Sequence, residues 1–220
     1  MSAILFGSIS TLIDTSELQR RAFNESFEEH GLDWNWSRGD YVAMLDSNGG
    51  AQRIADYAQS RGEDVDAAAV HATKSQIFRE LLKTAAPTAR PGVLETVQEA
   101  KRNDLKLGFV TTTSPENISA LLATLAPDIG AETFDVIVDS DAVETSKPDA
   151  AAYEFALQQL GEDADSAVAI EDNVGGVTAA AAAGVKCIAF PNENTADGDF
   201  TAASETVDAL DAQRIVALVA

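Results

Sequence analysis

Short apolar runs recur along the chain and divide it into two kinds of sequence. Residues 3–6 form an apolar run of four that ends at Gly7, which is typical of a short buried strand. Between residues 15 and 85, apolar residues recur at helical spacing, with no strand pattern. After Pro87, apolar strands alternate with helical patterns. The chain is therefore predicted to hold one strand, a helical block and then a βα series.

The boundaries of the expected elements follow from their periodicity and from glycine and proline punctuation. In the first block, helices are predicted over residues 15–30, 38–46, 50–60 and 65–84. Later helices are predicted over residues 92–103, 114–125, 148–160, 174–183 and 211–219. Strands are predicted at residues 107–111, 136–138, 168–170 and 185–190, with a strand or turn near 206–209. Loops are predicted at residues 7–13 and 192–203.

This order of elements indicates the fold class. Parallel strands joined by helical crossovers predict a three-layer, Rossmann-like α/β domain. The helical block follows the first strand directly, so we expect it to lie over the carboxyl ends of the strands, where ligands bind. The expected domains are an α/β core, residues 1–13 and 86–220, and an inserted helical cap, residues 14–85. Such a cap is typical of an enzyme that closes on a small molecule.

The chain is strongly acidic. Its 220 residues carry a formal net charge of -21, and the pI is about 4.2. Such a surface repels the phosphates of nucleic acids and anionic lipids, so we expect neither as a partner. Solubility is the simplest meaning of this acidity. A small anionic substrate would then depend on a local positive pocket.

Cysteine and histidine are too few to indicate a disulfide or a zinc site. Cys187 is the one cysteine, and its apolar surroundings predict a buried small hydrophobe. His30 and His71 lie far apart and lack the spacing of zinc ligands. The sequence has no signal-peptide pattern and no apolar stretch of about 18 residues. A cytoplasmic protein is therefore expected.

Four polar segments follow predicted strands, so they should meet at one edge of the sheet. The first, residues 7–10, contains no acid, base or strong nucleophile. The second contains Thr111, Thr112 and Thr113 before a helix start. Hydroxyls and backbone amides there suit a phosphate. A capping threonine within a polar turn is the alternative, and it stays open.

The other two segments carry charge. Lys147 precedes a helix start, where the helix dipole disfavours a cation. This indicates an anionic partner, either a ligand or a carboxylate, with an exposed lysine as the alternative. Glu171 and Asp172 follow a strand and offer oxygens to a divalent cation, although Asp172 or Asn173 could simply cap the next helix. Together the four segments predict a phosphate site with a metal position.

The ordered motifs resemble those of the haloacid dehalogenase-like (HAD) superfamily, and more closely its CbbY and β-phosphoglucomutase-like group with a helical cap. They fall on residues 6–15, 108–117, 146–148 and 170–176. The resemblance covers nearly the whole chain and implies a sugar-phosphate phosphatase that uses Mg²⁺. It implies that Thr111, Thr112 and Lys147 bind phosphate and that Glu171 and Asp172 hold the metal.

The first motif departs from the family at its two reacting positions. In the family, one aspartate attacks phosphorus and a second acts as general acid and base. Counting back from Thr11-Leu12, these positions are Gly7 and Ile9 in this sequence. Gly7 cannot form an aspartyl-phosphate, and Ile9 cannot protonate a leaving oxygen. Because Mg²⁺ also loses a carboxylate ligand, its binding is expected to be weak or absent.

Two further expectations concern the same edge of the sheet. In register with the family, Ser8 is expected to point away from the site, and no histidine is evident beside it to activate its hydroxyl. Lys147 is left either to bind an anion or to pair with Asp172, and the pairing would close the site.

The cap segments also resemble the CbbY branch. A position that is often histidine there is Gln19 in this sequence. Cations of the cap are suited to a distal phosphate, although each is also expected to be solvated. The candidate cap residues for substrate contact are Glu17, Gln19, Arg20, Arg38, Gly50, Arg53 and Lys74.

The sequence thus predicts a HAD-like protein that has lost ordinary phosphoaspartyl hydrolysis and still binds phosphate or a phosphorylated metabolite. Two alternatives stay open. One is an active hydrolase of small phosphate esters that works by an unusual route. The other is a regulatory protein-interaction module in which the old site is vestigial. Fold alone does not separate these functions, and the sequence indicates no particular protein partner.

Overall fold

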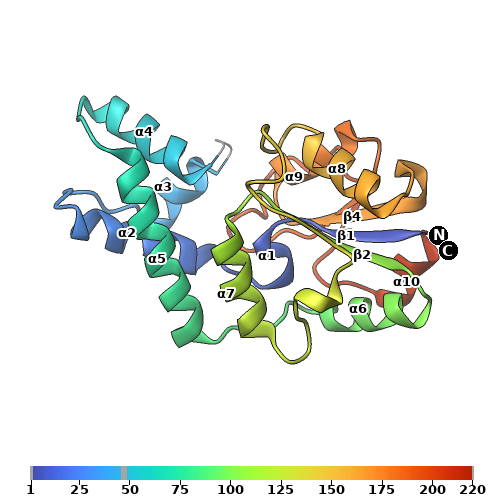
Figure 1. Ribbon diagram of the computed structural model, residues 1–220. Coiled ribbons are helices and arrows are strands. Elements are labelled where there is room, and N and C mark those ends of the chain that lie inside the picture. Colours follow the sequence, from blue (N-terminus) through green and yellow to red (C-terminus); the bar gives the residue numbers. More distant parts are fainter. Residues whose placement is uncertain (1, 46–48, 220) are drawn as a thin grey trace. The chain divides into compact units, whose positions relative to one another are not determined.

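Six parallel strands form one sheet in the order β3-β2-β1-β4-β5-β6. Figure 1 shows the computed structural model, which describes residues 2–45 and 49–219. The strands are β1 (Ala3–Phe6), β2 (Lys106–Val110), β3 (Val136–Val138), β4 (Ala167–Glu171), β5 (Lys186–Ala189) and β6 (Glu205–Thr206). The central strands are buried on both faces, which explains why they appear in the sequence as continuous apolar runs. The three-layer α/β fold predicted from the sequence is confirmed.

Helices cover both faces of this sheet. Helices α8 (Ala151–Leu160) and α9 (Val174–Ala182) lie on one face, and α6 (Val93–Arg102) and α10 (Ala212–Ala217) lie on the other (Figure 1). Helix α7 (Pro115–Leu125) follows β2, and two 3₁₀ turns, η1 (Ala131–Thr133) and η2 (Ala164–Ser166), precede β3 and β4. The sequence did not predict these turns, because three residues are too few to show a period.

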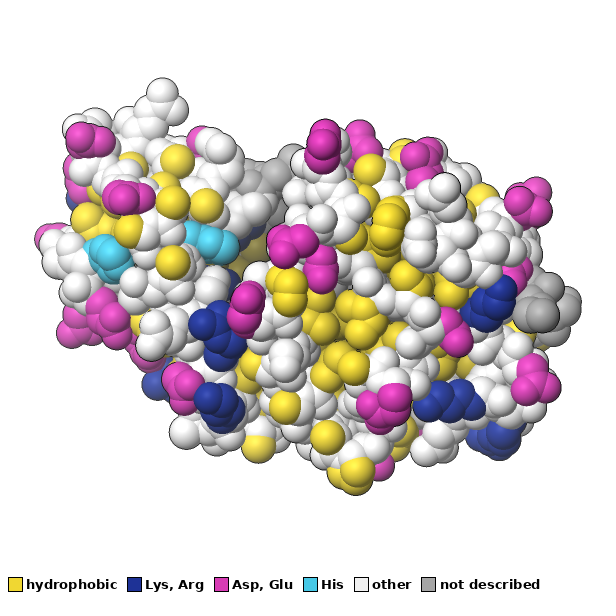
Figure 2. Space-filling view, viewed as in Figure 1, with side chains coloured by type: hydrophobic (Ala, Val, Ile, Leu, Met, Phe, Trp, Pro, Cys, Tyr) yellow, Lys and Arg dark blue, Asp and Glu magenta, His cyan; other side chains and the backbone are white. Residues whose placement is uncertain are grey.

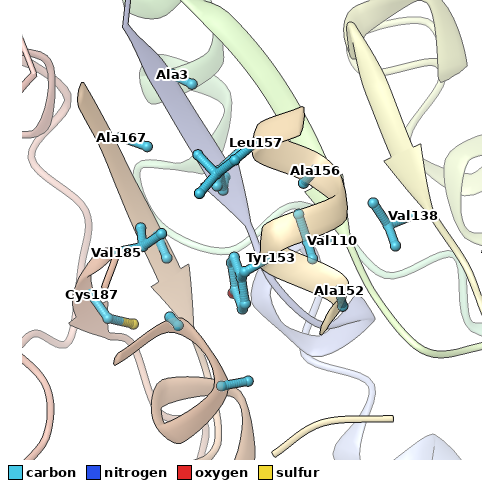
Figure 3. Close-up of a cluster of buried hydrophobic side chains, with 14 of the residues drawn as sticks. Ala3, Val110, Val138, Ala152, Tyr153, Ala156, Leu157, Ala167, Val185 and Cys187 are labelled. Atoms are coloured by element: carbon cyan, nitrogen blue, oxygen red, sulfur yellow. The ribbon is translucent and has the colours of Figure 1, made fainter. Parts of the chain in front are cut away.

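The layer under α8 and α9 is made of small and branched side chains. Tyr153 and Leu157 of α8 pack with strand residues such as Ala3 and Val110, and with Val185 just ahead of β5 (Figure 3). On the other face, the rings of Phe6 and Phe109 pack against Phe134, with centroids 6.5 and 5.4 Å apart. Burying these side chains supplies the main stabilisation of the sheet.

Several predicted boundaries differ from the structure, and two of the differences lie near the ends of strands. Residues Ile9–Leu12 form a one-turn helix, α1, where a loop was predicted. Ser8 caps it by accepting a hydrogen bond from the backbone N–H of Ser10, 3.2 Å away. Helix α8 begins at Ala151, not at Pro148. Asp149 turns the chain before it, because its carboxylate accepts a bond from the Ala151 N–H at 2.9 Å.

The chain divides into two compact units, Met1–Asp14 with Pro87–Ala220, and Thr15–Ala86. The second unit, here called the helical unit, contains α2 (Ser16–Glu29), α3 (Arg38–Ala43), α4 (Gly50–Arg61) and α5 (Ala67–Ala85). Its second helix was predicted over residues 38–46, but α3 ends at Ala43 and a turn follows at Met44 and Leu45. Residue 46 and the separator Asn48 lie outside the described residues.

Aromatic side chains form the core of the helical unit. Trp36 lies between Phe23 and Phe27, with ring centroids 4.9 and 4.6 Å away, and Trp34 packs edge-on against Phe27. Each such pair adds about 0.5–1.5 kcal/mol beyond the burial of its area. The connection between α2 and α3 is therefore held by its two tryptophans.

Acidic side chains are spread over both units on the face in Figure 2, and they do not gather at one place. Within residues 2–45 and 49–219, no helix combines the length and the apolarity that a bilayer crossing requires.

Candidate functional site

The end of β1 meets the end of β4 at one edge of the sheet. The Gly7 N–H donates to the carbonyl of Ile170 at 2.8 Å, and the Ser8 N–H donates to Glu171 Oε2 at 3.3 Å. The Ser8 hydroxyl donates to Asp172 Oδ1. The expectation that Ser8 points away from this edge was therefore wrong. Its position as the cap of α1 turns the side chain toward the carboxyl end of β4.

Thr111 lies at the end of β2, next to β3. Its N–H donates to the carbonyl of Val138 at 2.9 Å, and its side chain is buried. The Thr111 hydroxyl oxygen accepts a bond from the Thr113 N–H at 3.3 Å, so Thr111 forms part of a local turn. The cap of α7 is Ser114, which accepts from the N–H of Asn117. Thr111 and Thr112 are thus not needed as caps, and their hydroxyls carry donors of the kind a phosphate oxygen accepts.

Lys147 lies at the same edge with 9% of its side chain exposed, and it forms an ion pair. Its Nζ lies 2.5 Å from Glu171 Oε1 and donates to the carbonyl of Val110 at 2.6 Å. The ammonium also lies 4.8 Å from the ring centroid of Tyr153. The sequence left open whether Lys147 binds an anionic ligand, pairs with a carboxylate or is exposed, and in the structure it pairs with a carboxylate. Pairing with Asp172 was wrong, because the partner is Glu171.

Glu171 is the most enclosed charged group of the cluster, with no exposed surface. Besides Lys147, its Oε1 accepts a bond from the Tyr153 hydroxyl at 2.7 Å. Burial raises the pKa of Glu171, while the neighbouring ammonium of Lys147 opposes this rise. Burial together with the Glu171 charge raises the pKa of Tyr153, so the phenol stays protonated as a donor.

Asp172 has a separate set of partners. Beyond Ser8, its carboxylate accepts bonds from Asn192 Nδ2 at 2.9 Å, from Asn173 Nδ2 at 3.1 Å and from the Thr11 hydroxyl at 3.4 Å. Asn173 caps α9 by accepting from the Gly176 N–H. The capping role left open for Asp172 or Asn173 therefore belongs to Asn173.

The donors around these carboxylates do not fit Mg²⁺. The ion takes oxygen ligands in near-octahedral geometry, whereas the Glu171 and Asp172 oxygens accept bonds from an ammonium, three hydroxyls, two side-chain amides and one backbone N–H. Among the described residues, no three His, Cys, Asp or Glu side chains form a group able to hold a metal. Position 7 adds no carboxylate, and Ile9 places a buried alkyl side chain in α1.

Sequence reasoning missed four residues that shape this edge. Tyr153 fits a core position of a helix, and Asn192 and Thr195 fall in a segment predicted as a loop. Thr195 donates to the backbone carbonyl of Asp172 at 2.6 Å. Arg90, ahead of Pro91, donates to the carbonyls of Ser10, Phe190 and Pro191 at 3.1, 2.7 and 2.6 Å. The one available signal was the polar composition of residues 192–195 directly after a strand.

In the helical unit, two of the predicted contact residues lie over one aromatic ring, and a third bonds to one of these two. Lys74 Nζ lies 4.7 Å and the Arg53 guanidinium 5.9 Å from the ring centroid of Phe23. Gln19 Oε1 accepts a bond from Lys74. Burial and the nearby Arg53 charge lower the pKa of Lys74 to about 7, and burial lowers the pKa of His71 to about 4.

Four further predicted residues belong to the helical unit, and one of them, Gly50, also lies against the Phe23 ring. Arg20 forms an ion pair with Glu17 at 2.8 Å and donates to the carbonyl of Trp36. Arg38 is exposed in the first turn of α3. Gly50 lies beside the His71 ring, so close that a Cβ at this position would overlap its Nε2.

Known proteins resemble this chain over most of its length. A sequence model of the haloacid dehalogenase-like hydrolase family matches residues 6–190. Protein CbbY of Cereibacter sphaeroides is 37% identical over 211 residues, covering 94% of this chain and 92% of that protein. Protein CbbY of Rhodobacter capsulatus is 36% identical over 215 residues, covering 96% and 95% of the two chains.

Solved structures show the same relationship. The crystal structure of CbbY from Rhodobacter sphaeroides in complex with phosphate has a TM-score of 0.89 and 37% identity, with 95% of this chain and 94% of that chain covered. A mutant of the same protein, solved in complex with xylulose-(1,5)bisphosphate, matches equally well. A β-phosphoglucomutase-like structure from Thermotoga maritima, at TM-score 0.71 and 23% identity, shows the shared fold alone.

Proposed function

We propose a function for this chain on the ground that it belongs to the haloacid dehalogenase-like hydrolase family and to its CbbY-like proteins. The chain is a catalytically impaired relative of sugar-phosphate phosphatases. It still binds phosphate or a phosphorylated metabolite. One observation carries the proposal. The two positions where the family places its reacting aspartates are Gly7 and Ile9.

The chemistry of these two positions argues against phosphoaspartyl hydrolysis. Glycine has no group that can attack phosphorus, and the alkyl side chain of Ile9 holds no proton for a leaving oxygen. Ser8 directly follows position 7, and its hydroxyl donates to the Asp172 carboxylate. We infer that Mg²⁺ binds weakly or not at all, since Glu171 and Asp172 take their partners from the chain itself.

Phosphate recognition is supported by what surrounds these positions. Thr111, Thr112 and Lys147 are the proposed phosphate contacts, because hydroxyls and an ammonium at strand ends suit an oxyanion. A CbbY protein with 37% identity has been crystallised with phosphate, and a mutant of it with xylulose-(1,5)bisphosphate. We infer a small phosphorylated metabolite as the ligand class.

We also propose that the helical unit acts as the cap of this site, with residues 14–85 as the cap and residues 1–13 and 86–220 as the core. Its proposed ligand contacts are Glu17, Gln19, Arg20, Arg38, Gly50, Arg53 and Lys74. Lys74 and Arg53 support this role most strongly, since both are buried cations on one aromatic face.

A second candidate function is a regulatory module with a vestigial site. The observation that favours it is the Lys147–Glu171 ion pair, which balances the cation that a phosphate would otherwise bind. Titration of the protein with inorganic phosphate separates the two candidates. Binding that is weakened in Lys147→Ala supports a retained ligand site, and undetectable binding to wild type supports the vestigial site.

The loss of hydrolysis is tested by phosphate release from a panel of sugar phosphates and bisphosphates with Mg²⁺. Wild type is expected to show no release above the background of a mock purification. Clear turnover by wild type that disappears in Lys147→Ala would contradict the proposal and favour an active hydrolase with an unusual route.

A further inference from the structure

The carboxylate of Glu171 lies between two glycines that come from different elements. A Cβ added to Gly7, at the end of β1, would come well under 3.0 Å from the Glu171 carboxylate, and so would a Cβ added to Gly176, in α9. Neither glycine has a positive φ, so backbone conformation does not require glycine at either position. What requires glycine is the space that the carboxylate fills.

The same carboxylate is fixed by three donors. Lys147 Nζ and the Tyr153 hydroxyl bond Oε1 at 2.5 and 2.7 Å, and the Ser8 N–H bonds Oε2 at 3.3 Å. With no exposed surface, Glu171 cannot meet a substrate from this position. It therefore does not replace the missing nucleophile and acts instead as an anion held inside the protein.

We infer that the Glu171 carboxylate occupies the anion position beside Lys147 and competes with phosphate for this lysine. The absence of side chains at Gly7 and Gly176 provides the space that this carboxylate fills. This inference rests on the proposed function and deepens it. The substitution at position 7 then has two linked effects. It removes the phosphoryl acceptor, and it opens the space that lets a carboxylate from β4 neutralise the cation of the site.

The two neighbouring glycines of α9 give a matched steric test. At Gly176 a Cβ would overlap the Glu171 carboxylate, whereas at Gly175 its nearest contact is Asn173 Oδ1 at an ordinary 3.4 Å. We expect Gly176→Ala to lower Tm by at least about 3 °C, as overpacking does, and Gly175→Ala to leave it unchanged or raised. In a Glu171→Ala background the difference between the two variants should disappear.

A charge test uses the near-isosteric variant Glu171→Gln, with Glu162→Gln as its control. Glu162 is also a poorly exposed carboxylate paired with a lysine, at 2.8 Å from Lys106 Nζ, so both variants lose one negative charge beside a cation. We expect inorganic phosphate, measured by calorimetry and by Tm, to bind Glu171→Gln at least about tenfold more tightly than wild type. Glu162→Gln should bind like wild type.

The inference is overturned if Gly176→Ala is as stable as Gly175→Ala, or if phosphate binds Glu171→Gln no more tightly than wild type. If Glu171→Gln fails to fold, the glycine pair in the wild-type background still decides. These results do not depend on phosphate release, so the inference and the proposed loss of hydrolysis can fail separately.

Discussion

The side chains of Lys147 and Lys74 are both largely enclosed, and the protein holds them in opposite ways. Lys147, at the edge of the sheet, lies 2.5 Å from the carboxylate of Glu171. Lys74, in the helical unit, donates to the neutral amide oxygen of Gln19 and lies 4.7 and 5.1 Å from the centroids of two phenylalanine rings. One cation is balanced by a charge, and the other is solvated by an amide and aromatic faces.

This difference shows where a ligand would meet resistance. At the sheet edge, a phosphate must first displace Glu171 from Lys147, and the ion pair opposes it. In the helical unit, burial has already lowered the pKa of Lys74 to about 7. An anion placed beside Lys74 would favour its charged form and raise that pKa. A negative charge beside Lys74 would therefore be favourable, whereas Lys147 already has one beside it in Glu171.

The largest expected effect comes from restoring both aspartates with Gly7→Asp and Ile9→Asp. A carboxylate at position 7 cannot share its space with Glu171, so the new side chain should displace Glu171 and become the partner of Lys147. We expect Mg²⁺-dependent phosphate release to rise at least about a thousandfold over wild type, the scale on which nucleophile losses are felt. Gly7→Asn with Ile9→Asn is the matched control and should stay inactive.

An inert restored variant that folds and binds Mg²⁺ would show that the substrate contacts of the helical unit have also been lost. The buried cations of the helical unit would then have no role in binding a ligand, and the contrast drawn above with the sheet edge would not hold for function.

A smaller effect is expected when the balanced cation is removed. Lys147→Ala leaves the carboxylate of Glu171 buried without its ammonium, which should lower the free energy of unfolding by about 3–5 kcal/mol. Lys83→Ala breaks an exposed pair with Glu80 and should cost only about 0–1 kcal/mol. Urea unfolding of both variants measures the difference. Equal losses would mean that Glu171 is not held as a buried ion.

The smallest effect, opposite in sign, is expected for Lys74. Its folded pKa of about 7 lies below the unfolded value of 10.5, so between these values the unfolded chain binds the proton that the folded chain has released. The free energy of unfolding should therefore rise with pH across this window. Lys74→Met should flatten the rise and stabilise the protein at pH 7 by about 1–4 kcal/mol.

The control for this titration is Lys83→Met, which removes an exposed lysine of the same helix, α5. Its pH profile should follow that of wild type. If Lys74→Met and Lys83→Met give the same profile between pH 7 and 10.5, Lys74 keeps an ordinary pKa and the contrast with Lys147 disappears.

Most of the fold could be predicted from the sequence, because long helices and buried parallel strands carry strong periodic signals. Helix α1 and the 3₁₀ turns could not, since one turn is too short for a period. The start of α8 was placed three residues early because proline was taken as its first residue, while Asp149 in fact forms a turn before it.

The sequence predicted which residues meet at the candidate site, but it did not predict which of them pair with one another. The ends of β1, β2 and β4 bring Gly7, Thr111 and Glu171 to one edge, as parallel strands do. Lys147 comes from the segment after β3 and bonds to Val110 and Glu171 there. Which acid pairs with Lys147 depends on side-chain direction at the end of β4, where neighbouring residues point to opposite faces. That alternation, together with the space at Gly7 and Gly176, selects Glu171 as the partner. The periodicity of a sequence predicts helices and strands, but it does not show how much space a glycine leaves for a neighbouring side chain.

The central claim is that this chain forms no phosphoryl-enzyme intermediate, because position 7 is glycine. The most direct measurement is intact-protein mass spectrometry after acid quench of a reaction with a small acyl phosphate and Mg²⁺. We predict no phosphoryl adduct on wild type and, in the Gly7→Asp, Ile9→Asp variant, an adduct on the carboxylate introduced at position 7. A phosphoryl group on wild type, located by peptide mapping to Ser8 or Glu171, would contradict the account.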